Sequence, residues 1–123
     1  MEGIKKSKMK YYTKFFYALI FILFTSCNSD KEIIRLLNSE EKEDIILGAY
    51  KAGKTGDKQF VPLLLKNAAD RRASINIKFK GFTVYQEKML ALQKIFKQAP
   101  PAKITDKPDS LVINFYTELS KEN

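Results

Sequence analysis

Residues 53–65 read GKTGDKQFVPLLL, and this stretch decides the fold that the sequence predicts. Gly53 and Gly56 end a preceding helix, because glycine readily takes the left-handed conformation that helix ends often need. Asp57 suits the N-cap of a second helix, and Pro62 lies near its first turn, where few backbone donors are lost. That helix is expected over residues 58–69, with one apolar face: Phe60, Val61, Leu64, Leu65 and Ala68.

Two further helices are predicted upstream of this unit. Residues 31–38 (KEIIRLLN) hold closely spaced Ile and Leu side chains, which fit about two helical turns. The next helix is expected from Ser39 to Ala52, with Asn38 and Glu41 as a capping box and acidic residues in its first turns. Its apolar stripe comprises Ile45, Ile46, Ala49, Tyr50 and Gly53.

Downstream, residues 75–84 alternate between apolar and polar side chains, which is typical of a strand. Lys80 and Gly81 fit a two-residue turn, so a short β-hairpin or extended excursion is expected near 75–84. Thr83 and Gln86 then form a capping box for a helix that runs through Lys97. After a proline-containing connector, a last helix begins near Pro108 with an apolar stripe: Leu111, Val112, Phe115, Tyr116 and Leu119.

Basic and aromatic side chains are interleaved around the alternating segment: Arg71, Arg72, Lys78 and Lys80 with Phe79, Phe82 and Tyr85. The alternation predicts that the aromatic rings face the core and the lysines face water. Binding of anionic lipid or of nucleic acid is the alternative. Of these two ligands we expect lipid, and no nucleic acid.

The 53–65 stretch resembles the turn and second helix of a HEAT-like repeat, in which a Gly-x-x-Gly-Asp turn precedes a Val-Pro-x-Leu pattern. Residues 91–95 (ALQKI) resemble the end of the first helix of such a repeat, with 109–116 in the second-helix position. The resemblance implies a mainly all-α fold of antiparallel helix pairs in an α-α superhelix, with about two repeats over residues 31–123. A generic helical hairpin with a Gly-Asp turn is the alternative.

The first 26 residues have the layout of an export signal. An uncharged apolar run of ten residues, Phe15–Phe24, follows a basic segment that contains Lys5, Lys6, Lys8, Lys10 and Lys14. A membrane-spanning helix needs roughly 20 apolar residues, so this run is short for an uncleaved anchor, which is the alternative. Thr25 and Ser26, which are small, lead to Cys27, the only cysteine of the chain.

Cys27 in this position resembles the lipobox cysteine of bacterial lipoproteins, although Phe24 stands where that family usually has leucine. The resemblance implies signal-peptide cleavage between Ser26 and Cys27 and acylation of Cys27, for example with palmitate. Residues 27–30 would then form a lipidated tether. It also implies membrane attachment in the cell envelope, and Asn28, where inner-membrane retention favours aspartate, indicates the outer membrane rather than the inner one.

Composition narrows the chemistry of the mature chain. Removing the first 26 of the 123 residues leaves 97, enough for one small domain. It also reduces the 22 basic residues to 17 and the 14 acidic ones to 13, so the net charge falls from +8 to +4. The chain has no histidine and a single cysteine, which excludes thiolate or imidazole metal sites and Ser–His or Cys–His nucleophiles. We therefore expect no metal, no cofactor, no catalytic residues and no enzymatic activity.

About two repeats is fewer than repeat proteins usually need, so the domain must be capped or must bind a partner. The main functional hypothesis is accordingly a lipid-anchored, non-catalytic protein-interaction module that uses the grooves between its helices. An envelope immunity or inhibitor lipoprotein that blocks a specific toxin or enzyme is the alternative. Catalysis by carboxylates, lysines or tyrosines is a third reading, and no pair of these residues has a distinctive spacing.

Overall fold

Residues 28–122 are described by a computed structural model, and they are mainly helical, which confirms the all-α class. Residues 28–37 are helical, and the helices that follow are α2 (Lys42–Thr55), α3 (Val61–Leu65), α4 (Val84–Phe96) and α5 (Ser110–Lys121). Two 3₁₀ turns, η1 (Lys58–Phe60) and η2 (Ile77–Phe79), precede α3 and α4. Residues from Glu32 onward form one compact unit.

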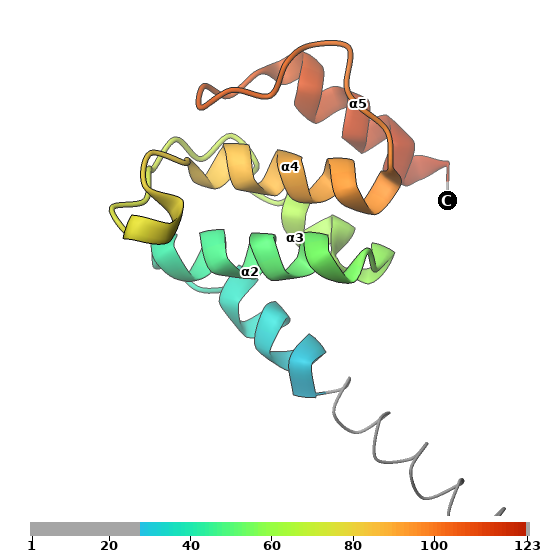
Figure 1. Cartoon of the computed structure of the whole chain (residues 1–123). Helices are drawn as coiled ribbons and strands as arrows, with labels where there is room; N and C mark the ends of the chain where they lie inside the picture. Colours follow the sequence, from blue (N-terminus) through green and yellow to red (C-terminus); the bar gives the residue numbers. More distant parts are fainter. Residues whose placement is uncertain (1–27, 123) are drawn as a thin grey trace, which may run out of the picture. The chain divides into compact units, whose positions relative to one another are not determined.

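Helix α4 is the centre of this unit. It packs most extensively against α2 and also contacts α3 and α5, while α3 contacts α5 (Figure 1). Most of the expected apolar faces meet in a main core, in which Phe60, Leu64, Tyr85, Met89, Leu92, Val112 and Tyr116 are fully buried. A second, smaller cluster contains Ile45, Ile46, Phe79 and Val84. The stripe read from residues 58–69 is therefore confirmed as a core face. The expected helix itself is shorter, because Lys66 is extended and Asn67 has a positive φ of 50° after α3 ends at Leu65.

Two of the expected side-chain caps are present, and a third, at Asp109, was not predicted, because the last helix was expected to begin near Pro108. Asp57 accepts a hydrogen bond from the backbone N–H of Gln59 at 3.0 Å, and Thr83 accepts one from that of Gln86 at 3.0 Å. Asp109 is the N-cap of α5 and accepts from the backbone N–H of Leu111 at 2.9 Å. These interactions supply partners for N–H groups that have none inside the helix.

The predicted capping box of Asn38 and Glu41 is wrong. The Asn38 side chain donates instead to the carbonyl of Ile34 at 3.0 Å and so closes the preceding helix. The Ser39 hydroxyl accepts from the N–H of Glu41 at 3.1 Å and donates to the Asp44 carboxylate at 2.8 Å. Ser39 therefore organises the turn, and α2 begins three residues later than expected, at Lys42.

The prediction that Gly53 ends α2 is wrong, because Gly53 lies within this helix. A Cβ at Gly53 would approach the Ala91 Cα to 3.0 Å, so this glycine allows the close approach of α2 and α4. Gly56 alone provides the expected left-handed end, with a φ of 68°.

The expected β-hairpin near 75–84 does not form, and the described residues 28–122 contain no strand. The segment expected to form the hairpin is instead a loop that leads into α4 at Val84, and one isolated antiparallel bridge between Ala73 and Thr83 closes it. A two-stranded hairpin is only marginally stable by itself, and the Asn76 side chain accepts from the N–H of Lys78 at 3.1 Å, which favours the local turn η2 over a ladder. The aromatic side chains nevertheless face inward as predicted: Tyr85 and Phe79 are buried and Phe82 is half-buried.

Candidate functional site

The predicted cleavage and lipidation site, Ser26 and Cys27, lies outside the described residues, as does the expected signal peptide 1–26. Residues 28–30, expected as part of a lipidated tether, are helical. Between residues 28 and 122, none of the helices has the length and apolar character that crossing a bilayer requires. The candidate sites below come from the helical unit itself.

An apolar groove lies where η1, α3, α4 and α5 meet, and we call it the α3 groove. It has a volume of about 290 Å³ and is lined by Lys58, Val61, Pro62, Leu65, Phe96 and Ser120. The expected apolar stripe explains part of this surface, because Val61 turns into the core while Leu65 stays half-buried at its edge. Pro62 is exposed in the first turn of α3, where its missing N–H costs no intrahelical hydrogen bond.

The wall of the groove formed by Phe96 is held in place from behind. The Phe96 ring stacks on that of Tyr116 with centroids 6.1 Å apart. Tyr116 is fully buried, and its hydroxyl donates to the Gln98 carbonyl at 2.9 Å. Burial raises the pKa of Tyr116 to about 12, so the hydroxyl remains protonated near neutral pH. Phe96 therefore presents a preformed apolar surface.

The rim of the α3 groove carries a positive charge. The Lys58 ammonium lies 6.0 Å from the centroid of the Phe96 ring, within the range of a cation–π interaction. Apolar lining with one cation at the edge suits an aliphatic or aromatic side chain of a partner that has a carboxylate beside it. The arrangement provides binding surface and no acid–base pair.

A second cavity, of about 420 Å³, is polar and lies between residues 37–40 and the segment that follows α3. Asp70 and Arg72 form an ion pair here at 2.7 Å, and Arg72 also donates to the Glu40 carbonyl at 2.7 Å. The hydrogen bond from Arg72 lowers the pKa of the Asp70 carboxyl. These contacts tie the start of the loop before α4 to the turn before α2, which is a structural role.

Lys88 lies at the base of this polar cavity and is only 3% exposed. Its ammonium donates to the Lys66 carbonyl at 2.7 Å, and burial lowers its pKa to about 8. The carbonyl of Lys66 follows the last helical residue of α3, so Lys88 fixes the end of α3 against α4. We assign it to the fold and not to a reaction.

Glu87 is the only buried carboxylate among the described residues, and burial raises its pKa. It is not among the residues that line either cavity, so no substrate is placed beside it. Within residues 28–122, no three Asp, Glu, His or Cys side chains are close enough to hold a metal ion. The absence of catalysis, metal and cofactor therefore stays a prediction for the chain as a whole.

The sequence did not reveal the α3 groove or the burial of Lys88. The groove combines residues 58–65 with Phe96 and Ser120, which are far apart in the sequence, and only their separate apolar faces could be read. Lys88 could have been suspected, since it directly precedes the buried Met89 on a helix with a broad apolar face. In comparisons with known proteins, no family model, curated protein or solved structure matches the chain.

Proposed function

We propose that this chain is a lipid-anchored, non-catalytic protein of the bacterial cell envelope that binds another protein through the α3 groove. The observation that carries the binding role is the groove itself, which offers Val61, Pro62, Leu65 and Phe96 beside the ammonium of Lys58. The attachment rests on the sequence, in which a basic segment and a short apolar run precede Cys27. The outer membrane is the favoured location.

We also propose that the helices form a HEAT-like pair of repeats. In stacked repeats each helix contacts its counterpart in the next repeat. The packing of α2 against α4, and of α3 against α5, supports this order of helix pairs.

The experiment is a pull-down of the full-length protein from detergent-solubilised envelopes of its own cells, compared across matched variants. Leu65→Glu places a carboxylate at a half-buried position that lines the groove. Leu111→Glu is the matched control, because Leu111 is a 63% exposed leucine of α5 that does not line the α3 groove. A third variant, Lys58→Ala, removes the positive charge at the rim of the groove without disturbing the core. Thermal unfolding of each variant checks that the fold persists.

We expect the wild type and Leu111→Glu to recover the same protein, and Leu65→Glu to lose it. Loss of a desolvated apolar contact at an interface costs about 2 kcal/mol, or roughly 30-fold in affinity. Lys58→Ala should weaken recovery to a smaller extent. Equal recovery by all four proteins would show that the groove is not the binding site. If the recovered protein is a toxin or an enzyme that loses activity on binding, the chain acts as an envelope inhibitor.

A further inference from the structure

The loop before α4 exposes two isoleucines at its tip. Ile75 is 81% exposed and Ile77 is 94% exposed, whereas the neighbouring Phe79 is buried. In a regular strand the side chains of Ile75, Ile77 and Phe79 would lie on the same face. The turn η2 instead leaves the two isoleucines exposed while Phe79 is buried. Two adjacent aliphatic side chains in water gain nothing from the fold, so their placement points to a surface that covers them.

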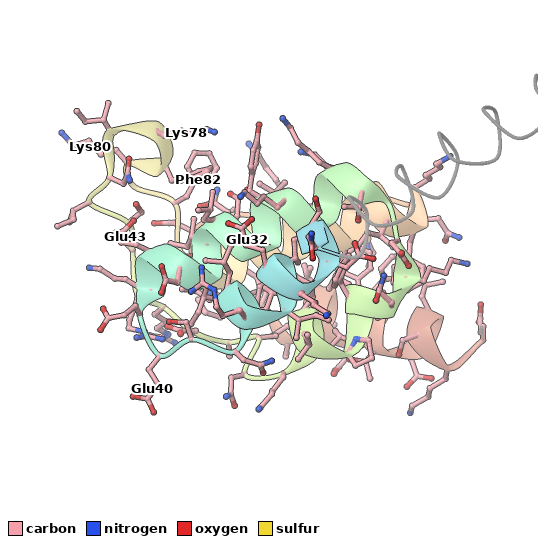
Figure 2. The ribbon with its side chains drawn as sticks, turned by 90° about the horizontal axis from the view of Figure 1, so that it is seen from below. Glu32, Glu40, Glu43, Lys78, Lys80 and Phe82 are labelled. Atoms are coloured by element: carbon pink, nitrogen blue, oxygen red, sulfur yellow. The ribbon has the colours of Figure 1, made fainter. Side chains whose placement is uncertain are left out.

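This tip is held firmly to α2. The Glu43 carboxylate accepts from the Ser74 hydroxyl at 2.6 Å and from the backbone N–H of Ile75 at 3.0 Å. The N–H of Ser74 donates to the Phe82 carbonyl at 2.8 Å, which closes the base of the loop. Figure 2 shows Glu43 on α2 close to the loop that carries Lys78, Lys80 and Phe82. The isoleucines are therefore presented by a defined loop.

Three lysines gather around Tyr50 next to this loop. The ammonium groups of Lys54, Lys78 and Lys94 lie 4.9, 4.7 and 5.5 Å from the centroid of the Tyr50 ring. They come from α2, the loop and α4, and the Tyr50 ring also packs edge-on against Phe79 at 5.3 Å. A hydrogen bond from Lys54 and the positive charge of the lysines lower the pKa of the Tyr50 hydroxyl.

None of these three lysines forms an ion pair within the described residues, although the buried Glu87 carboxylate interacts electrostatically with Lys94. The ion pairs there join Lys51 with Glu32, Arg72 with Asp70 and Lys121 with Glu118. Lys80, which directly follows η2, is a fourth exposed lysine and lies on the same loop as Ile77. Ammonium groups that converge repel one another, so a negatively charged ligand stabilises this arrangement.

We propose that Ile75, Ile77 and the four lysines Lys54, Lys78, Lys80 and Lys94 form a docking face for an anionic phospholipid membrane. The lysines lie at the level of the phosphate groups, and the isoleucines enter the boundary between headgroups and acyl chains. Aliphatic tips with basic neighbours fit such an interface. This inference rests on the proposed lipid anchor, which holds the domain at a membrane and turns docking into an intramolecular step.

Single-stranded nucleic acid fits this face less well than lipid. Its bases stack on exposed aromatic rings, whereas the rings of this segment are turned inward: Phe79 and Tyr85 are buried. Isoleucine offers no ring face to a base, but it transfers favourably from water to an acyl environment.

The test uses tryptophan as a reporter, because the chain contains none. The full-length variants Ile77→Trp and Leu111→Trp are reconstituted into vesicles with brominated acyl chains, made either of phosphatidylcholine alone or with phosphatidylglycerol. Leu111 is the matched control, an exposed leucine on α5 outside the proposed face. Bromine quenches only tryptophan that enters the acyl region, and co-sedimentation reports separately whether the chain is attached.

We expect blue-shifted, quenched emission from Ile77→Trp in vesicles with phosphatidylglycerol, and solvent-exposed emission from Leu111→Trp. Adding Lys54→Gln and Lys94→Gln should lower the ratio of docked to undocked domains about 25-fold, since each lysine contributes about fivefold near an anionic surface. Lys66→Gln with Lys121→Gln, two exposed lysines outside the face, should leave the ratio unchanged.

Each other outcome overturns the proposal in a distinct way. If the protein co-sediments but Ile77→Trp is quenched no more than Leu111→Trp, the docking face is wrong while the membrane anchor stands. Equal quenching in both vesicle types overturns the assignment to anionic lipid. Emission that shifts with single-stranded RNA and not with vesicles would make the face a nucleic-acid surface. If no variant co-sediments, the proposed anchor fails together with the docking face.

Discussion

Gly48→Ala tests the packing of residues 32–37 against α2. Gly48 is buried in α2, and a Cβ at this position would lie 2.8 Å from the Leu36 Cβ and 3.1 Å from the backbone nitrogen of Leu37. The Leu36 Cβ is bonded directly to the backbone and the Leu37 nitrogen is part of it, so neither atom can move away by a side-chain rotation. The helix that carries Leu36 must therefore shift to accommodate alanine.

The expected magnitude is the difference between two opposing effects. Alanine favours an exposed helix interior over glycine by about 1 kcal/mol. Overpacking of a well-packed interior costs about 1–3 kcal/mol. Since the closest approach is to immobile atoms, we expect the cost to win and the free energy of unfolding to fall by about 1 kcal/mol. For a domain of this size, such a loss lowers the midpoint of thermal unfolding by roughly 4–8 °C.

The assay is thermal and urea unfolding of Gly48→Ala, of Leu36→Gly and of the double variant. Leu36→Gly removes the nearest of the atoms that obstruct alanine. Gly48→Ala should therefore cost less in that background than in the wild type, and the two substitutions should not be additive. A Gly48→Ala protein that is more stable than the wild type would refute the reasoning, because it would mean that alanine fits and only helix propensity counts.

The remaining predictions concern four buried polar groups, which belong to Tyr116, Tyr85, Thr83 and Lys88. Tyr116→Phe should lower the free energy of unfolding by about 1 kcal/mol, because it removes the hydrogen bond to Gln98. Tyr85→Phe should cost less, because the buried Tyr85 hydroxyl makes no hydrogen bond of normal geometry; a larger loss for Tyr85→Phe in urea unfolding would contradict this. Thr83→Ala should cost about 1 kcal/mol through loss of the α4 cap, and no loss of helix stability would count against that cap. For Lys88 the folded-state pKa of about 8 lies below the ordinary 10.5, so the unfolded chain binds the proton more tightly. The cost of burying the charged ammonium is fully present below pH 8. The free energy of unfolding should therefore rise between pH 8 and pH 10.5, by about 2 kcal/mol after allowance for partial solvation. Lys88→Met should remove that rise, and an unchanged pH profile would show that Lys88 is not responsible.

Local signals in the sequence were sufficient for much of the fold. Asp57 and Thr83 cap helices as predicted, because a cap depends on residues only two or three positions apart. The apolar faces of residues 60–68 and of α4 were also confirmed as core. The predicted start of α2 was wrong because Asn38 and Ser39 compete for the same turn, and the choice depends on the Ile34 carbonyl and on Asp44.

Features that depend on distant contacts were not predictable. Gly53 was read as a helix end, yet its role depends on Ala91, which only the packing of α2 on α4 brings close. Lys54, Lys78 and Lys94 come from three elements, so no local pattern shows that they share Tyr50. The strand-like alternation of residues 75–84 predicted a short hairpin, whereas Asn76 favours a local turn that leaves Ile75 and Ile77 exposed.

The central claim is that Cys27 anchors this helical domain to a membrane, and its most direct test is the intact mass of the protein extracted from membranes. A Cys27→Ser variant serves as the control. We predict a mass equal to residues 27–123 plus a diacylglyceryl group, with or without an amide-linked acyl chain, and loss of this species in the variant. An unmodified chain of all 123 residues in the membrane extract would contradict the lipid anchor.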